Sequence, residues 1–252
     1  MGANMRALPS TLTLIILILL ALSKTGADDT DATQTARLLA ILLDSGRATI
    51  AANQSLINDP DKSNKGFTPD VFERQLIENF KKRSGIDLSR LDEQLLPKDA
   101  KGLITKLVEE SKKTVASYQP AINISGIKYK GLIPATFGTE TASRFQAWSG
   151  IYMKQVAPEV VLRNLKNRAD EFETQALSQF AAPGYPRSGE NIISATMENG
   201  TVVRVLLPLF YSQQCLGCHS EPKGQRDISG YPKEGGKEGD LGGAISVKIS
   251  QK

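Results

Sequence analysis

The sequence has little cysteine and almost no histidine. Its 252 residues include two cysteines, Cys215 and Cys218, and one histidine, His219. A disulfide between residues three positions apart closes too short a loop to stabilise a fold much. Zinc prefers four ligands, and the chain has no further cysteine or histidine to complete such a site. We therefore expect the two cysteines to serve the chemistry of the protein.

A long hydrophobic run and a dense basic patch are also missing. The apolar run over residues 12–22 is shorter than the roughly 20 residues that a helix needs to cross a bilayer. Arg6 precedes this run and Thr25, Gly26 and Ala27 follow it, which is the pattern of a secretory signal peptide. The formal net charge is only +4, so no nucleic acid partner is expected. We expect residues 1–27 to direct the protein to the periplasm, or to anchor it if they are not cleaved.

Residues 215–219 read Cys-Leu-Gly-Cys-His, which is the attachment pattern of a c-type haem. Two thiols at this spacing can each add to one vinyl group of the same porphyrin edge. The next residue then lies under the iron, so its imidazole becomes an axial ligand. The motif predicts one covalently bound haem c, attached at Cys215 and Cys218, with His219 as an iron ligand.

Three other interpretations of the motif are open. A thioredoxin-like pair begins a helix, but Ser220, Glu221 and Pro222 interrupt any helix that follows. The adjacent Cys218 and His219 do not easily reach one zinc ion together. A plain structural disulfide is the third. The haem interpretation is preferred, because two cysteines and one histidine scattered at random would rarely produce this motif.

The first part of the mature chain is predicted to be helical. Apolar residues recur at helical intervals over residues 31–56, 69–84 and 98–118, and Pro120 is expected to end the third helix. In the first segment some apolar residues recur at seven-residue intervals, which fits either core packing or a homodimer interface. The residues concerned are Ala36, Leu39, Leu43, Ile50 and Ile57.

The remainder of the chain mixes helices with strands. Strands are predicted at 192–197 and 201–210, joined by Asn199-Gly200, a strong hairpin signal. A short extended stretch at 127–133, helices at 134–150 and 169–180, a long loop at 220–243 and a last strand at 244–249 complete it. These patterns predict an α+β fold, an antiparallel sheet flanked by helices. We divide the mature chain into an N-terminal helical region, 28–119, and a haem domain, 120–252.

Several stretches between residues 120 and 250 resemble one family in their order and spacing. They are 131–137, Ala157-Pro158, 163–167, Asp170, Glu173, Pro208, 215–219, Tyr231-Pro232 and 239–244. The chain resembles the periplasmic single-haem domains with a PAS-like fold, which occur as stand-alone proteins and as outer domains of bacterial chemoreceptors and histidine kinases. Leu165 departs from the family proline. Some members use a distant cysteine as second iron ligand, which this chain lacks.

The resemblance indicates a candidate for the sixth iron ligand. Met153 lies just before Ala157-Pro158, in a stretch similar to the family's haem-contacting region, and a thioether there would raise the reduction potential. Alternatively, Met153 is a core methionine and the iron is five-coordinate or holds water. Tyr152, Tyr211 and lysines are lesser candidates.

Other residues are expected near the haem. Arg163 and Asn167 are candidates to bind the propionates, although Arg163 could instead pair with Asp170 or Glu173. Tyr231 and Pro232 are expected to pack against the haem plane or edge. The single tryptophan, Trp148, is expected in the core, with haem contact as a minority interpretation.

The leading functional hypothesis is a non-enzymatic sensor of redox state or of NO, CO or O₂. Its state would shift the N-terminal helices, and a signalling partner protein would read the shift. The alternative is a periplasmic electron-transfer cytochrome with a redox partner. A peroxidase-like enzyme would need a distal acid–base group, and the chain has no second histidine to serve.

Overall fold

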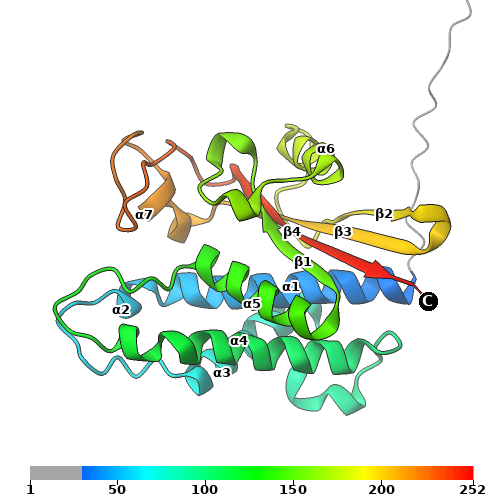
Figure 1. Ribbon diagram of the computed structural model, residues 1–252, viewed down its shortest axis with the longest axis horizontal. Helices are drawn as coiled ribbons and strands as arrows, with labels where there is room; N and C mark the ends of the chain where they lie inside the picture. Colours follow the sequence, from blue (N-terminus) through cyan, green and yellow to red (C-terminus); the bar gives the residue numbers. More distant parts are fainter. Residues whose placement is uncertain (1–29, 252) are drawn as a thin grey trace, which may run out of the picture.

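The computed structural model describes residues 30–251, so the expected signal peptide lies outside the described part of the chain. The described residues form a layer of helices, an antiparallel sheet packed on it, and the helix α6 on the opposite face of the sheet (Figure 1). This is the α+β architecture that the sequence predicts. Within residues 30–251, no helix is both long and apolar enough to cross a membrane.

Helix α1 (Asp31–Ala52) runs through the middle of the molecule. It contacts α3, α4 and α5 on one side and the strands β3 and β4 on the other. The core-packing interpretation of its recurring apolar residues is confirmed, because all of them are fully buried within the chain. Homodimerisation stays a prediction, and its interface would need other residues. The buried set is Ala36, Leu39, Leu43 and Ile50, together with Ile57 of α2 (Gln54–Ile57).

Helix α3, the next long helix of this layer, begins and ends where capping signals stand. Thr68 caps the start of α3, since its hydroxyl accepts a hydrogen bond from the Val71 amide at 3.3 Å. Gly85 ends the same helix at a positive φ of 77°. The layer comprises α3 (Pro69–Ser84), the 3₁₀ helix η1 (Leu88–Glu93), α4 (Ala100–Ile122) and α5 (Pro134–Ser149).

One expectation for the region after residue 118 is wrong. Pro120 does not end the third helix, because α4 continues to Ile122. A proline removes its own backbone hydrogen bond and crowds the carbonyl four residues earlier, but the complete burial of Ile122 holds the last turn in place. The stretch at 127–133, expected to be extended, pairs with no strand and belongs to the irregular connection between α4 and α5.

The four strands form one antiparallel sheet in the order β1-β4-β3-β2. The predicted hairpin is confirmed: β2 and β3 are joined by η4 (Glu198–Gly200), and Asn199 and Gly200 adopt positive φ values of 55° and 92°. The strands are β1 (Tyr152–Val156), β2 (Ile193–Met197), β3 (Val202–Phe210) and β4 (Leu241–Ser250).

The two faces of the sheet bury different partners. Val203, Val205 and Leu207 of β3 share one hydrophobic core with the N-terminal helices. Leu206, which lies between Val205 and Leu207 in the strand, belongs to a smaller hydrophobic cluster on the other face, beneath α6 (Glu171–Ala181). Alternate side chains of a strand point to opposite faces, so this division follows from the sequence pattern. Within residues 30–251, the N-terminal helices and the sheet therefore pack against each other through one continuous core.

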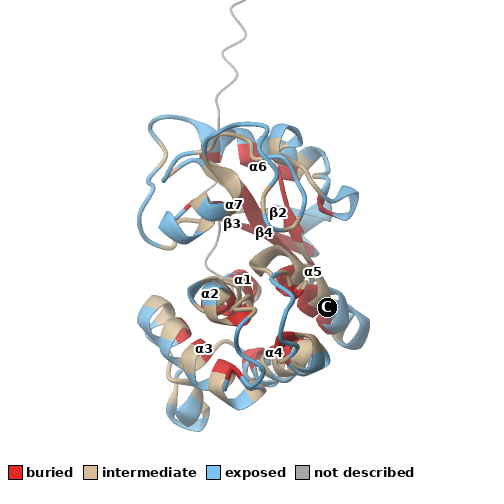
Figure 2. Cartoon of the chain, turned by 90° about the vertical axis from the view of Figure 1, so that its left-hand side faces the viewer, coloured by how far each residue is buried: buried red, intermediate tan, exposed pale blue. Residues whose placement is uncertain are grey.

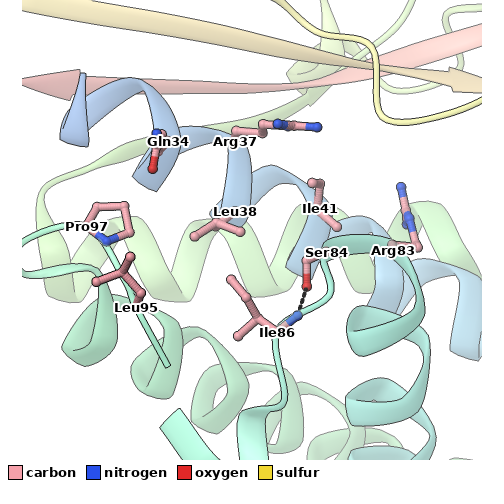
Figure 3. A pocket seen from close by; sticks show the side chains of 9 residues that line it. All are labelled: Gln34, Arg37, Leu38, Ile41, Arg83, Ser84, Ile86, Leu95 and Pro97. Atoms are coloured by element: carbon pink, nitrogen blue, oxygen red, sulfur yellow. Dashed lines mark hydrogen bonds between the residues drawn. The ribbon is translucent and has the colours of Figure 1, made fainter. Parts of the chain in front are cut away.

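A pocket lies at the end of the helical layer that is far from the Cys-x-x-Cys-His motif (Figures 1 and 3). Two of its lining side chains are cationic, but Arg83 already forms ion pairs with Asp44 at 2.9 Å and Glu190 at 2.6 Å. The lining residues are Gln34, Arg37, Leu38, Ile41, Arg83, Ser84, Ile86, Leu95 and Pro97.

A buried ion pair joins α6 to the sheet and yields a stability prediction. Glu173 has no exposed surface and accepts hydrogen bonds from Arg204 at 3.0 Å and from the Tyr152 hydroxyl at 2.9 Å. We expect Glu173→Ala to lower the free energy of unfolding by about 3–5 kcal/mol, because it leaves Arg204 buried without this partner. Glu171→Ala, at the exposed start of the same helix, is the control. Equal melting temperatures for the two variants in thermal unfolding would contradict the prediction.

Candidate haem site

The motif occupies a single helical turn directly after the central strand β3. The 3₁₀ helix η5 (Gln213–Cys215) leads into α7 (Leu216–His219), which Figure 2 shows at the near end of the sheet. Cys215, Cys218 and His219 are spaced i, i+3 and i+4, and residues at these spacings share one face of a helical turn. Both cysteines are free thiols.

This geometry bears on the other interpretations of the motif. A turn of four residues is not the long helix that a thioredoxin-like pair begins. The two thiols are not joined in a disulfide. Within residues 30–251, no group of three or more histidine, cysteine or acidic side chains is arranged to hold a metal ion, so a zinc site has no ligand set there.

The imidazole of His219 is held at one nitrogen and stacked on one face. Its Nδ1 lies 2.9 Å from Glu234 Oε2 and 3.1 Å from the Tyr211 hydroxyl. The Tyr211 ring stacks on the imidazole, with centroids 4.6 Å apart and planes 24° apart. Burial, with a contribution from Arg163, lowers the pKa of His219, which favours the neutral form that binds metals. Nε2 makes no hydrogen bond within residues 30–251.

Arg163 is the centre of a cluster that ties the motif to the loop covering it. Its Nε and Nη2 donate to the two carboxylate oxygens of Glu234 at 2.6 and 3.0 Å, and Nη1 donates to Asp227 at 2.6 Å. Nη2 also donates to the Cys218 carbonyl at 2.9 Å. Burial alone would raise the pKa of Glu234, but the hydrogen bonds from Arg163 and His219 outweigh it and hold the pKa below its ordinary value. We call Arg163, Asp227 and Glu234 the Arg163 cluster.

The predicted partners of Arg163 are therefore corrected. Arg163 does not pair with Asp170 or Glu173, because these two stand at the start of α6 and bind Arg204 of β3 instead. Its guanidinium pairs with Asp227 and Glu234, and binding of the propionates by Arg163 stays a prediction. The cluster is formed by loop residues far from Arg163 in sequence, which no local pattern indicates.

Tyr231 and Pro232 lie beside the Arg163 cluster. The Arg163 guanidinium stands 5.5 Å from the Tyr231 ring centroid, and its Nη2 is 3.5 Å from the Pro232 carbonyl oxygen. Asp227 shapes this loop, because its Oδ1 accepts hydrogen bonds from the amides of Ser229 and Tyr231. Tyr231 keeps 44% of its surface exposed, which leaves it free to pack against a bound group.

Met153 and Asn167 are not brought to the motif. Met153 is only 2% exposed and lies in the main core, paired with Val247 in the middle of the sheet. Val247 pairs with Val205, five residues before the end of β3, or roughly 17 Å along the strand. The expectation that Met153 lies at the iron is thus corrected, and the core-methionine alternative describes its position.

Asn167 is also buried away from the motif. Its carbonyl oxygen accepts a hydrogen bond from the Ala157 amide at 3.0 Å, and its Oδ1 lies 3.4 Å from the Thr139 hydroxyl. These contacts join η3 (Leu165–Asn167) to the end of β1 and to α5. Trp148 is 55% exposed beneath Lys106, so the expectation that it lies in the core is wrong.

Four residues at the site were missed or undervalued by the sequence analysis. Asp227 and Glu234 are two of several acidic residues in the loop 220–243, and nothing in the sequence separates them from the others. Tyr211 entered only as a lesser ligand candidate. Tyr129, from the α4–α5 connection, stands beside the motif: burial, and then the proximity of Asp227 and Cys218, raise its pKa.

Two glycines allow Tyr211 to lie against the imidazole, and they yield a prediction. A side chain at Gly242 would collide with the Tyr211 ring, as would one at Gly236. We expect Gly242→Ala to displace Tyr211 and remove its ring-current effect on His219. Because His219 is the single histidine, its imidazole protons give one readily assigned NMR signal set. Gly102→Ala, in open space on α4, is the control. An unchanged His219 spectrum in Gly242→Ala would contradict the stacking.

Comparisons with known proteins place the chain in a family. The sequence model of the Tll0287-like family matches residues 30–250. Among solved structures, the cyanobacterial heme-protein Tll0287 is similar at 19% identity and a TM-score of 0.41, covering 63% of this chain and 98% of its own. A search of the curated proteins found no match. The family match confirms the resemblance that the sequence motifs indicated. The chain belongs to the Tll0287-like family.

Proposed function

We propose that this protein carries one haem c, attached through Cys215 and Cys218 with His219 as an axial iron ligand. The observation that carries the proposal is the convergence of the only cysteines and the only histidine of the chain on one helical turn. The thiols are free, the imidazole is favoured in its neutral form, and Nε2 is unengaged. Membership of a family whose namesake is a heme-protein supports the same assignment. When bound, the haem supplies a redox-active iron able to bind small ligands.

The function that these residues favour is sensing of redox state or of a diatomic gas. The sequence has no second histidine, and the two methionines within residues 30–251 stand elsewhere. Met153 is enclosed in the core, and Met197 lies beside the β2–β3 turn. A strong methionine or histidine ligand opposite His219 is therefore not supplied by this part of the chain. The lack of such a ligand favours an open coordination position on the iron, to which NO, CO or O₂ could bind.

The N-terminal helices are placed to transmit a change at the motif. Helix α1 contacts η5, the segment that contains Cys215, and also packs along β3 and β4. We propose that a shift of η5 alters the packing of α1, and that a partner protein reads the altered helices. A homodimer through this region would use the outer faces of α3 and α4, because α1 is covered. The signal-like residues 1–27 support a periplasmic location, with membrane anchoring as the variant if they are retained.

A second candidate function is electron transfer. Both cysteines and His219 are only partly buried, and Tyr231 beside them is exposed, so an attached haem would have an edge near the surface. Such exposure favours exchange with a redox partner. An enzymatic role is not proposed, because the chain has no second histidine to act as a distal acid–base group.

Covalent attachment gives the first test. In a host equipped for cytochrome c assembly, we expect the purified protein to have the mass of the polypeptide plus one haem. Cys215→Ser and Cys218→Ser should each remove one thioether and shift the pyridine haemochrome band. Ser212→Ala, whose hydroxyl lies 3.5 Å from Cys215 Sγ, is the control and should keep both bonds. A wild-type protein that is colourless at the bare polypeptide mass would refute the proposal.

Ligand binding gives the second test and separates the two functions. Optical spectra of the ferrous protein should change on addition of CO or NO, because no strong protein ligand blocks the iron. Met153→Leu should leave those spectra unchanged, since it replaces a core side chain at a cost below about 1.5 kcal/mol. Spectra that never respond to either gas would favour the electron carrier. If the iron ligation of Met153→Leu differs from that of the wild type in the absence of gas, Met153 reaches the iron after all.

A further inference from the structure

Glu234 is the acidic side chain closest to the proposed iron ligand. Its Oε2 lies 2.9 Å from Nδ1 of His219, within ordinary hydrogen-bond distance. The residue comes from the loop after the motif, fifteen positions along the chain from His219. A histidine that binds a metal through one ring nitrogen donates the proton on its other nitrogen, and the acceptor of that proton fixes the ring.

Two acceptors compete for that proton, and the geometry selects the carboxylate. The Tyr211 hydroxyl lies 3.1 Å from Nδ1, but its ring is stacked on the imidazole. Stacked rings place their atoms above one another, so the hydroxyl approaches Nδ1 from the face of the imidazole. The N–H bond points outward in the ring plane. Glu234 is also closer, and an ionised carboxylate is a stronger acceptor than a phenol oxygen.

The carboxylate is held so that it cannot turn away. Arg163 donates to both of its oxygens, and the same guanidinium donates to Asp227 and to the Cys218 carbonyl. Cys218 is the residue before His219, so the frame that fixes Glu234 is anchored on the motif turn itself. The Arg163 cluster sets two carboxylates against one guanidinium, which leaves a negative charge beside the imidazole.

We propose that Glu234 is a positioning residue for His219: it accepts the Nδ1 proton, leaves Nε2 as the nitrogen that faces the iron, and strengthens the imidazole as an electron donor. The inference rests on the proposed haem attachment and deepens it. A more strongly donating imidazole stabilises ferric over ferrous iron, so Glu234 lowers the reduction potential of the bound haem. Arg163 acts through Glu234 by fixing its orientation.

The test compares potentials of haem-loaded variants. Glu234→Gln keeps the shape of the side chain but weakens the acceptor, so the midpoint potential should shift upward and the iron–histidine stretching frequency of the ferrous protein should fall. Glu238→Gln removes the same charge from an exposed position of the same loop and should leave both values unchanged. Glu234→Asp, which keeps the carboxylate, should lie between the wild type and Glu234→Gln.

Each other outcome has a defined meaning. If loaded Glu234→Gln keeps the wild-type potential and stretching frequency, the role of Glu234 is overturned while haem attachment stands. If Tyr211→Phe moves both values and Glu234→Gln does not, Tyr211 is the acceptor and the proposal is wrong. If the wild-type protein gives no haemochrome signal, the proposed function fails first and this inference falls with it.

Discussion

The candidate site depends on the ion pairs of one guanidinium. Arg163 joins three segments that are separate in the sequence: its own stretch after β1, the motif turn through the Cys218 carbonyl, and the covering loop through Asp227 and Glu234. The side chain is partly buried, where such pairs are worth more than on an open surface. The loop 220–243 is also tied to the motif by its backbone, because the Gly236 amide donates to the His219 carbonyl at 2.6 Å.

The sheet determines where that bridge forms. Strand β3 lies second from one edge, and its end at Phe210 delivers η5 and α7 beyond the sheet. Strand β4 returns beside it, so the tight stretch around Gly242 meets Tyr211 as the chain re-enters the sheet. Two hydrogen bonds between Tyr211 and the chain at residues 239–240 close this junction, from the Tyr211 amide and to its carbonyl, each at 2.8 Å.

Most of the fold could be predicted from sequence signals that act over a few residues. Thr68 with Pro69, the Asn199-Gly200 turn and the Cys-x-x-Cys-His motif each act over a few residues, and the structure has a helix start, a hairpin and a helical turn at these three places. The errors involve contacts between distant segments. Nothing near Arg163 distinguishes Glu234 from Glu173 as its partner, and nothing near Met153 shows which face of the sheet it occupies. Such pairings are decided only when the whole chain is packed.

The position of α1 has a consequence for how the chain folds. The first described helix is enclosed partly by β4, which ends at Ser250, so segments more than 190 residues apart complete one core. Contacts between residues so far apart in sequence form only after much chain entropy has been lost, because the long intervening loop must close first. Such contacts favour slow and concerted folding. Most of the polypeptide must be present before α1 is covered, whereas the two thiols of the motif stay partly accessible even when the core is complete.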